Sequence, residues 1–382
     1  MHDDDGLSGA FPYERLRRYP DVEAPNLQAW DATDLLLAER GIADASERGL
    51  DGSEIAIIGD NYGALALRLA AAGFTGVRVH QDLATGREAL RRNAEELGLS
   101  GLQVPCELEA ELLAGARLVL LQLPRGLAEL EEYADAVARW ASPDVVVLAG
   151  GRVKHMTLAM NDVLGASFEV VAAELAVRKS RLLVASVPRT VPENPPFPVC
   201  AKHDDVGLTL CTHGAVFAGS RLDLGTRFLL GFLDAMPVGT AVDLGCGTGA
   251  LAAAYALAHP EAVVVATDRS AAAVRSARAT VSANGLAGRV LVEHDDAAAS
   301  RPDASADVVL LNPPFHLGAS VHAGAGLRLF EAAARILRPG GELWAVYNSH
   351  LDYRRRLQTS VGQTTVKGRS GKFTVTRSVR NG

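Results

Sequence analysis

The chain has 382 residues, 48% of them hydrophobic and 22% charged, a globular composition that excludes a disordered chain and allows two domains. The first thirty residues contain no long apolar stretch, and the longest apolar run, Ala250–Ala258, is too short to cross a bilayer. We therefore expect neither a signal peptide nor a membrane span. Four cysteines without a Cys-x-x-Cys pair predict a reducing, cytoplasmic environment and argue against a disulfide framework.

The net charge of −7 by itself argues against binding to nucleic acid. The distribution of charge weakens that argument. Residues 1–60 contain fourteen acidic residues and five arginines, whereas residues 352–382 contain eight Lys or Arg residues and one acid. A basic C-terminal end on an acidic protein indicates a surface that can contact phosphates.

In chain order, the first half begins with a short apolar strand at residues 55–58, followed by a loop with Gly59 and Gly63. A second apolar strand, Val77–His80, ends near Asp82. A further strand ends in Leu121, Gln122, Leu123 and Pro124. Short apolar strands that alternate with helical segments predict a parallel sheet covered by helices.

Five prolines between residues 188 and 198 interrupt this pattern, and neither a helix nor a central strand tolerates such a density of proline. The sequence therefore predicts a first domain over residues 1–190, a linker over 191–215 and a second domain over 216–382.

The second half repeats the pattern of the first. We expect the following strands and helices: Ala241–Leu244, Val263–Thr267, Ser270–Asn284, Ala306–Leu311, a helix at 323–337, and a strand at Glu342–Tyr347 after the Pro339–Gly341 turn.

The two halves align as copies of one unit. Residues 55–66 match 241–252 without a gap at an offset of 186 residues, and the same offset carries Asp268 onto Asp82. The first copy has Asp60 and Asn61 in its glycine loop where the second has Cys246 and Gly247. We predict an α/β protein with two tandem Rossmann-like domains, of which the N-terminal one is degenerate.

The loop from Asp243 to Gly249 has a Gly-x-Gly-x-Gly pattern between a strand and a helix. Its glycines, Gly245, Gly247 and Gly249, allow a sharp turn and close approach of a cofactor to the backbone. Asp268 follows about twenty residues later, the spacing of an acid that binds ribose hydroxyls. Dinucleotide dehydrogenases share these features but have a Gly-x-Gly-x-x-Gly loop, so the pattern favours a methyltransferase that uses S-adenosylmethionine (SAM).

The tetrapeptide Asn312, Pro313, Pro314 and Phe315 follows the strand Ala306–Leu311 and carries the predicted chemistry. The prolines stiffen the turn, and both the Asn312 side chain and the Pro313 carbonyl can accept hydrogen bonds from an exocyclic amine. Phe315 offers a flat surface on which a base can stack. The pattern predicts methyl transfer to a planar amine at the C-terminal domain.

Other polar residues allow competing interpretations. Asp295 and Asp296 follow a strand at 290–293, and we expect Asp296 to contact the adenine amine of SAM, although a solvated acidic turn is nearly as good an explanation. His316 is more readily explained as a structural histidine than as a contact of the target base. Cys200, His203, Cys211 and His213 do not have the spacing of a usual zinc finger, so we expect no metal.

The glycine loop and the Asn-Pro-Pro-Phe-His segment, on a duplicated fold with a degenerate first copy, resemble the bacterial ribosomal RNA guanine-N2 methyltransferases. The resemblance covers nearly the whole chain and includes Gly150–His155, Ala176–Leu182 and Leu222–Arg227. Asn348–Tyr353 and Gly371–Val375 look most like the branch that acts on 23S rRNA, and the 16S rRNA branch is the close competitor. Residues 317–320 depart from the more polar pattern that we expect, which leaves the target nucleotide open.

We expect a cytoplasmic monomer. The resemblance implies that it uses SAM to methylate the N2 amine of an unpaired or flipped-out guanine, by direct displacement and without a strong general base. Two functions of other kinds remain as alternatives. One is methylation of a protein glutamine, although that family prefers Tyr at the position of Phe315. The other is a non-catalytic role in RNA binding or ribosome assembly.

We expect the basic C-terminal residues to hold the RNA, with help from a second basic group in the first copy. The C-terminal group is Arg354, Arg355, Arg356, Lys367, Arg369, Lys372, Arg377 and Arg380, and the N-terminal group is Arg152, Lys154, Arg178, Lys179 and Arg181. Ordinary solvated surface charge is the simpler explanation for any single member.

Overall fold

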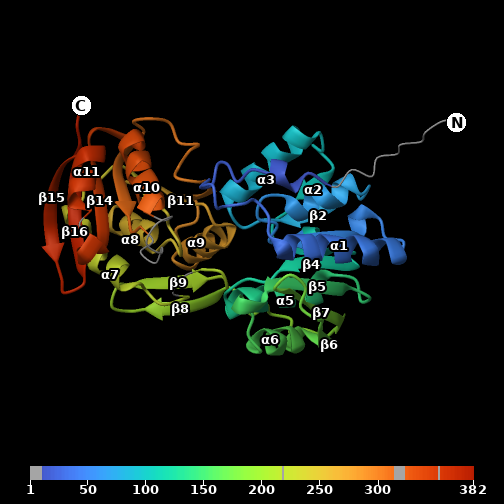
Figure 1. Ribbon diagram of the computed structural model, residues 1–382. Helices are drawn as coiled ribbons and strands as arrows, with labels where there is room; N and C mark the ends of the chain where they lie inside the picture. The colour runs from blue at the N-terminus through green and yellow to red at the C-terminus, as the bar shows by residue number, and fades with distance from the viewer. Residues whose placement is uncertain (1–10, 217–218, 314–322, 352) are drawn as a thin grey trace. The chain divides into compact units, whose positions relative to one another are not determined.

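A computed structural model describes residues 11–216, 219–313, 323–351 and 353–382. The chain divides into two compact units, residues 1–195 and 196–382, each built around a sheet with helices on its faces (Figure 1). Within the described ranges, no helix is both long enough and apolar enough to span a membrane.

Each unit contains a seven-stranded sheet, and the two sheets have the same strand order. The order is β3-β2-β1-β4-β5-β7-β6 in the first unit and β12-β11-β10-β13-β14-β16-β15 in the second. Five strands of each sheet are parallel, and the other two (β6 and β7, β15 and β16) pair antiparallel. The strands of the first unit are β1 (Ile55–Ile58), β2 (Val77–His80), β3 (Gln103–Pro105), β4 (Leu118–Gln122), β5 (Val146–Arg152), β6 (Phe168–Ala173) and β7 (Ser180–Pro188). Those of the second are β10 (Thr240–Leu244), β11 (Val263–Asp268), β12 (Val290–His294), β13 (Ala306–Leu311), β14 (Leu337–Asn348), β15 (Gly362–Arg369) and β16 (Phe373–Arg380).

Helices cover both faces of each sheet. In the first unit α1, α2 and α3 pack on one face and α4, α5 and α6 on the other, and in the second unit α7, α8 and α9 lie opposite α10 and α11. The first-unit helices are α1 (Ala32–Glu47), α2 (Ala64–Ala71), α3 (Ala84–Leu97), α4 (Ala110–Leu113), α5 (Leu127–Trp140) and α6 (Ala159–Ser167). The second-unit helices are α7 (Leu224–Leu230), α8 (Ala250–Ala258), α9 (Ala271–Ala283), α10 (Ala323–Ile336) and α11 (Arg354–Ser360). Short 3-10 helices are η1 (Tyr13–Arg15), η2 (Gly52–Glu54), η3 (Val153–His155), η4 (Leu233–Ala235) and η5 (Ser349–Leu351).

The alternation of side chains along a strand divides the core into two layers. In β10, Ala241 faces α7, α8 and α9, whereas Val242 faces α10 and α11. Strands buried on both faces must be apolar throughout, which is why short apolar runs marked them in the sequence. The predicted doubly wound α/β fold and its duplication are confirmed.

The strand order reverses at the same place in both sheets. β10 lies between β11 and β13, all three parallel, so the loops after β10 and β13 leave the same edge of the sheet. Ligands of open α/β sheets bind outside the carboxyl ends of the strands at such a reversal. The fold therefore brings the glycine loop after β10 close to Asn312 after β13.

The segment expected to be a linker, residues 191–215, contains a hairpin of β8 (Val199–His203) and β9 (Leu208–Thr212). Strand β9 packs on α9, whose Ser276, Thr280 and Asn284 side chains hydrogen-bond to the β9 segment's backbone. These residues are four positions apart, so they share one face of the helix. The hairpin is thus a folded part of the second unit, and the connection between the units is the proline-rich stretch before it.

Cys200 and Cys211 form a disulfide across this hairpin, so the prediction against disulfides is wrong. The two cysteines are cross-strand partners with Cα atoms 4.0 Å apart, a proximity that only the folded hairpin creates. The disulfide also removes both thiolates from any zinc site. His203 Nε2 lies 2.8 Å from the Ser220 carbonyl, and among the described residues no group of three or more His, Cys, Asp or Glu residues could hold a metal.

One predicted turn differs from the structure. Pro339, Gly340 and Gly341 lie within β14, at the point where its pairing with β13 jumps from Ala306–Leu337 to Val308–Glu342. The extra residues on β14 form an irregularity between two stretches of regular pairing. Extended residues on both sides of a bulge count as one strand, which sequence alone could not reveal.

Candidate active site

The loop after β10 turns back sharply toward the end of β11. The backbone N–H groups of Gly245 and Cys246 both donate to the Thr267 carbonyl at 2.9 Å, and Gly247 N–H donates to Asp268 Oδ2 at 2.9 Å. Gly245, Gly247 and Gly249 all have positive φ angles, which explains why the loop requires glycine. A Cβ on Gly249 would also lie 2.9 Å from the Ala277 Cβ, so glycine lets α8 begin against α9.

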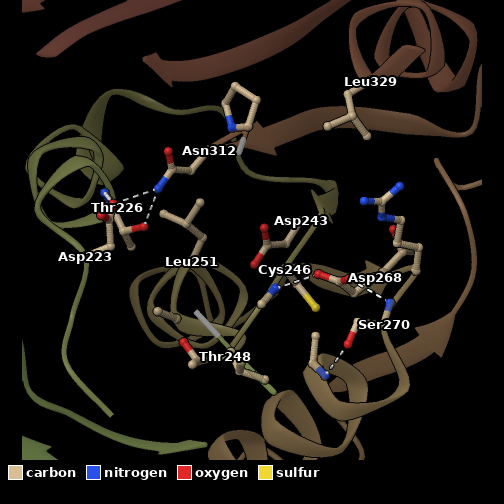
Figure 2. A pocket seen from close by; sticks show the side chains of 18 of the residues that line it. Asp223, Thr226, Asp243, Cys246, Thr248, Leu251, Asp268, Ser270, Asn312 and Leu329 are labelled. Carbon is tan, nitrogen blue, oxygen red and sulfur yellow. Dashed lines mark hydrogen bonds between the residues drawn. The ribbon is translucent and has the colours of Figure 1, made fainter. Parts of the chain in front are cut away.

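Asp268 ends β11 and is held by backbone donors on two sides. Its Oδ2 accepts from Gly247 and its Oδ1 accepts from Ser270 N–H at 2.9 Å (Figure 2). Ser270 in turn caps α9 through a hydrogen bond from Ala273 N–H at 3.2 Å. These two bonds fix the orientation of the carboxylate, which lines the cavity described below.

Asp243 lies at the base of the loop, 1% exposed, and its Oδ2 accepts from Ala252 N–H at 2.9 Å. Burial raises the pKa of Asp243 to about 7. The carboxyl group thus links the end of β10 to the first turns of α8 and lines the cavity described below.

Asn312 follows β13 directly and is held by residues at the start of α7. Its amide nitrogen donates to Asp223 Oδ2 and to Thr226 Oγ1, both at 2.8 Å. Its Oδ1 is buried and has no hydrogen-bond partner among the described residues. Pro313, the next residue, is buried and also lines the cavity. Pro314, Phe315 and His316, which the sequence analysis also singled out, lie outside the described residues.

The two acids after β12 have different environments. Asp295 Oδ2 accepts from Ser300 N–H at 2.8 Å and from its hydroxyl at 2.7 Å, which fixes the local turn. Asp296 forms an ion pair with Arg328 of α10. Both acids line the cavity, and Asp296 is 19% exposed at its side chain.

These residues surround one cavity of about 580 Å³, a size typical of small-molecule sites. In Figure 2, Asn312 lies on one side of the cavity and Asp268 on the other, with Asp243 and Cys246 between them. Of the sequence-predicted site, the cavity lining includes Asp243, Gly245, Gly247, Asp268, Asp296, Asn312, Pro313 and Lys372. A glycine loop without side chains, the carboxylate of Asp268 and an apolar wall that includes Leu251 fit a nucleoside cofactor such as SAM.

The basic residues of the C-terminal end divide into two groups. Arg354, Arg355 and Arg356 of α11 are exposed, and Lys372 lies in the β15–β16 turn beside the cavity. Arg377, by contrast, forms an ion pair with Glu342, and Arg380 donates to backbone carbonyls of Arg335 and Leu337. These last two arginines join neighbouring parts of the second unit, which their sequence position did not reveal.

Sequence analysis did not assign a role to Asp223, Thr226, Arg328 or Phe373, all of which line the cavity. Asp223 and Thr226 have a recognisable local pattern, an acid three residues before a threonine at a helix start. Their contact with Asn312, 89 and 86 residues away in the chain, has no local signal.

The first unit has polar residues of its own in the corresponding positions. Asp60 is fully buried and accepts from the backbone N–H groups of Gly63, Leu65 and Ala66. Gln122 is the residue of the first unit equivalent to Asn312. Ile55 of β1 pairs with Leu118 of β4, and the equivalent Ala241 of β10 pairs with Val308 of β13. Gln122 donates to Asp34 of α1, as Asn312 donates to residues of α7.

The predicted match of Asp82 with Asp268 is wrong. In the first sheet Ala56 pairs with Arg78, and in the second the equivalent Val242 pairs with Val265. Counting along β2 and β11 from these pairs makes Gln81 the residue equivalent to Asp268. Leu83 N–H donates to Gln81 Oε1 as Ser270 N–H donates to Asp268 Oδ1. The first unit has one residue fewer between its loop and β2, so a constant sequence offset missed the true partner. The degenerate copy therefore has Gln81 in place of the acid Asp268 and Asn61 in place of the middle glycine, Gly247.

Comparison with known proteins agrees with this geometry. A family model described as the methyltransferase small domain matches residues 207–377, and one described as the RLMG N-terminal domain matches residues 7–189. A solved 16S rRNA N2 methyltransferase from T. thermophilus, in complex with AdoMet and guanosine, has the same fold, with a TM-score of 0.73 and 22% identity over 97% of this chain and 99% of that one. The fold and site thus define a SAM-dependent methyltransferase.

The curated relatives identify the family. Ribosomal RNA large subunit methyltransferase G of Streptomyces coelicolor is 36% identical over 96% of this chain and 97% of its own length. The protein of the same name from Pseudomonas paraeruginosa is 36% identical over 91% of this chain and 93% of its own. The chain belongs to the family of ribosomal RNA large subunit methyltransferase G proteins.

Proposed function

We propose that this chain methylates the exocyclic N2 amine of a guanine in 23S ribosomal RNA. The observation that carries the proposal is the amide of Asn312, whose nitrogen is engaged and whose oxygen has no partner among the described residues. An acceptor without a partner, at the carboxyl end of β13 and in the same cavity as Asp268, suits a substrate N–H group. The names of the full-length relatives support large-subunit rRNA as the substrate.

We assign one set of cavity residues to SAM and another to the guanine. We assign Asp268 to the ribose hydroxyls of SAM, the Gly245–Gly249 loop to close backbone contact with the cofactor, and Asp296 to its adenine amine. When bound, SAM supplies an electrophilic methyl group on a positively charged sulfur. Asp296 also pairs with Arg328, so an adenine amine there would share a carboxylate that already has one partner.

Asn312 acts on the nucleophile. The N2 lone pair of guanine is delocalised into the ring, and acceptors that hold its N–H groups favour a pyramidal nitrogen whose lone pair can face the methyl group. The N2–methyl bond then forms as the sulfur–methyl bond breaks, and one N2 proton leaves afterwards to water. Asn312 and the Pro313 carbonyl are the acceptors that we assign to this step. The sequence pattern assigns stacking of the base to Phe315, which with Pro314 lies outside the described residues. Placing both reactants at contact distance supplies much of the rate.

RNA contact in this proposal comes from Arg354, Arg355 and Arg356 on α11 and from Lys372 beside the cavity. Three exposed guanidinium groups on one short helix are suited to phosphates. The proposal also implies a cytoplasmic protein, because its substrate is made and assembled there, and we treat the monomer as the active form.

The test uses tritiated SAM with unmodified transcripts of 23S and 16S rRNA, each also assembled into subunit particles, and with a peptide release factor as the glutamine substrate. We expect label only with 23S RNA or its particle, recovered as N2-methylguanosine after nuclease digestion and mass spectrometry. Label in 16S RNA alone would move the target to the small subunit, and label in the release factor would replace RNA by protein. No transfer to any of them would favour a non-catalytic role.

A further inference from the structure

The side-chain amide of Asn312 can be placed in two ways that differ by exchange of its oxygen and nitrogen. Only one of them presents an acceptor to a substrate amine, because the other presents an N–H group to another N–H group. Packing scarcely distinguishes the two placements, since the two ends of the amide have nearly the same shape. Something else must select one of them.

The start of α7 makes this selection. A carboxylate can only accept, so Asp223 Oδ2 at 2.8 Å identifies the facing atom of Asn312 as the nitrogen. Thr226 Oγ1, also at 2.8 Å, takes the second N–H of the same nitrogen. Figure 2 shows the nitrogen turned toward these two residues and the oxygen turned away from them.

The two acceptors are themselves fixed by the helix they begin. Asp223 is the N-cap of α7, and its Oδ2 accepts from Thr226 N–H at 2.9 Å. Thr226 is 8% exposed and therefore has little freedom to turn its hydroxyl elsewhere. Residue 225 between them is glycine, and a Cβ there would lie 3.0 Å from Asp223 Oδ2 and 3.5 Å from Asn312 Oδ1. Glycine thus leaves space beside both the carboxylate and the amide oxygen.

We propose that Asp223 and Thr226 are positioning residues that hold the Asn312 amide with its oxygen toward the substrate amine. They act through Asn312, to which both are hydrogen-bonded. The inference rests on the proposed function, because it needs Asn312 to accept from an amine. It adds that recognition of the amine depends on a helix cap 86 and 89 residues away in the chain.

The experiment replaces Thr226 by Val, which keeps the shape and the backbone N–H of the cap but removes one acceptor. Thr226→Ser restores the hydroxyl and is the matched variant. Five quantities are measured on the full chain: the single-turnover rate of methyl transfer to 23S transcript, SAM affinity, the melting temperature, the affinity for guanosine and the affinity for inosine. Inosine lacks only the N2 amine, so the ratio of the two affinities reports recognition of that amine.

We expect Thr226→Val to lower the transfer rate by about 10–100-fold, since misplaced polar groups in active sites cost rates of this order or more. The preference for guanosine over inosine should fall several-fold, because only guanosine has the amine that Asn312 Oδ1 accepts. SAM affinity and the melting temperature should stay near those of the parent, and Thr226→Ser should recover most of the rate and of the preference.

Two results would overturn the inference: a Thr226→Val protein that methylates like the parent, or one that loses guanosine and inosine affinity equally together with its melting temperature. Failure of the proposed function gives a different outcome. In that case the parent itself neither prefers guanosine nor transfers methyl groups to RNA.

Discussion

At the residue scale, the site depends on a few polar groups whose partners are known. The Asn312 side chain is hydrogen-bonded to residues at the start of α7. Asp268 is hydrogen-bonded to the glycine loop and to Ser270, and Asp243 is buried. Asn312 and Asp268 lie on different sides of the cavity, and the proposed function assigns them to different reactants. Changes on one side should therefore leave the other largely intact.

We expect Asn312→Ala to reduce methyl transfer at least about 100-fold and to leave SAM affinity within about twofold of the parent. The reason is that the proposed function assigns Asn312 to the transition state and assigns the loop and Asp268 to the cofactor. Tritium transfer and calorimetry measure the two quantities. Ser282→Ala, an exposed change on α9, is the control, and near-normal turnover of the Asn312 variant would rule out the role assigned to this amide.

The buried acids of the first unit predict a pH dependence of stability. Burial and the nearby Asp60 raise the pKa of Asp34 to about 8, and burial raises that of Asp60 to about 6. The folded state then binds more protons than the unfolded state between about pH 4 and 8, so stability falls as pH rises across that range. For one such group the slope is at most about 1.4 kcal/mol per pH unit.

Asp34→Asn should remove part of this slope and raise the melting temperature at pH 8, by about 2–4 °C for each kcal/mol gained. Asn can still accept from Asp31 N–H, and Gln122 can turn its amide to match. Thermal unfolding at pH 5, 6, 7 and 8 measures the effect, with the exposed Asp162→Asn as the matched control. Equal pH profiles for parent and Asp34→Asn would mean that Asp34 is not held protonated.

At the scale of elements, α11 packs on the core by one face and exposes a run of arginines on the other. Its Leu357 is buried against the core, while Arg354, Arg355 and Arg356 are exposed. The preceding Tyr353 packs against Phe330 and Tyr347, with ring centroids 5.2 and 5.4 Å away, which anchors the start of the helix. The three arginines can therefore be reversed without disturbing the core.

Reversal of Arg354, Arg355 and Arg356 to Glu should weaken RNA binding and flatten its salt dependence, with unchanged SAM affinity. Each lost phosphate contact should lower the slope of log affinity against log salt by about 0.7–0.9. A series of single, double and triple variants serves as its own control, because the slope should fall in steps. A triple variant that binds and methylates rRNA like the parent at every salt concentration would show that α11 is ordinary surface.

At the scale of the whole molecule, duplication has produced two similar sheets and one complete site. The first unit has Asp60 in its loop, and Gln81 at the position equivalent to Asp268. The Gln81 side-chain amide donates to the backbone carbonyl of Asp60 at 2.6 Å. In the first unit these polar groups are thus hydrogen-bonded to one another and to the backbone, whereas the equivalent groups of the second unit line the cavity. This difference supports one cofactor for each chain.

Calorimetry on the full chain should therefore give a SAM stoichiometry near one. Asp268→Ala should weaken that single binding event strongly, since the acid lies in the second unit only. A stoichiometry near two, or a binding event of parent affinity that survives in Asp268→Ala, would show that the first unit also holds SAM.

The features that depend on local pattern and short spacing could be predicted from the amino-acid sequence. Apolar runs of four to six residues revealed the strands, and the loop Gly245–Gly249 and Asn312–Pro313 marked the carboxyl edge, because these properties are set by residues close in the chain. The doubly wound fold followed from their alternation. Even the degenerate character of the first copy was visible in Asn61 and Gln122.

Features that depend on contacts between residues far apart in the chain could be seen only in the folded protein. Strand register replaced Asp82 by Gln81, hairpin pairing joined Cys200 to Cys211, and folding of α7 against β14 brought Thr226 to Asn312. A one-residue deletion or an 86-residue separation leaves no trace in local pattern. These contacts form only when whole elements pack, and they determine how the side chains of the site are oriented.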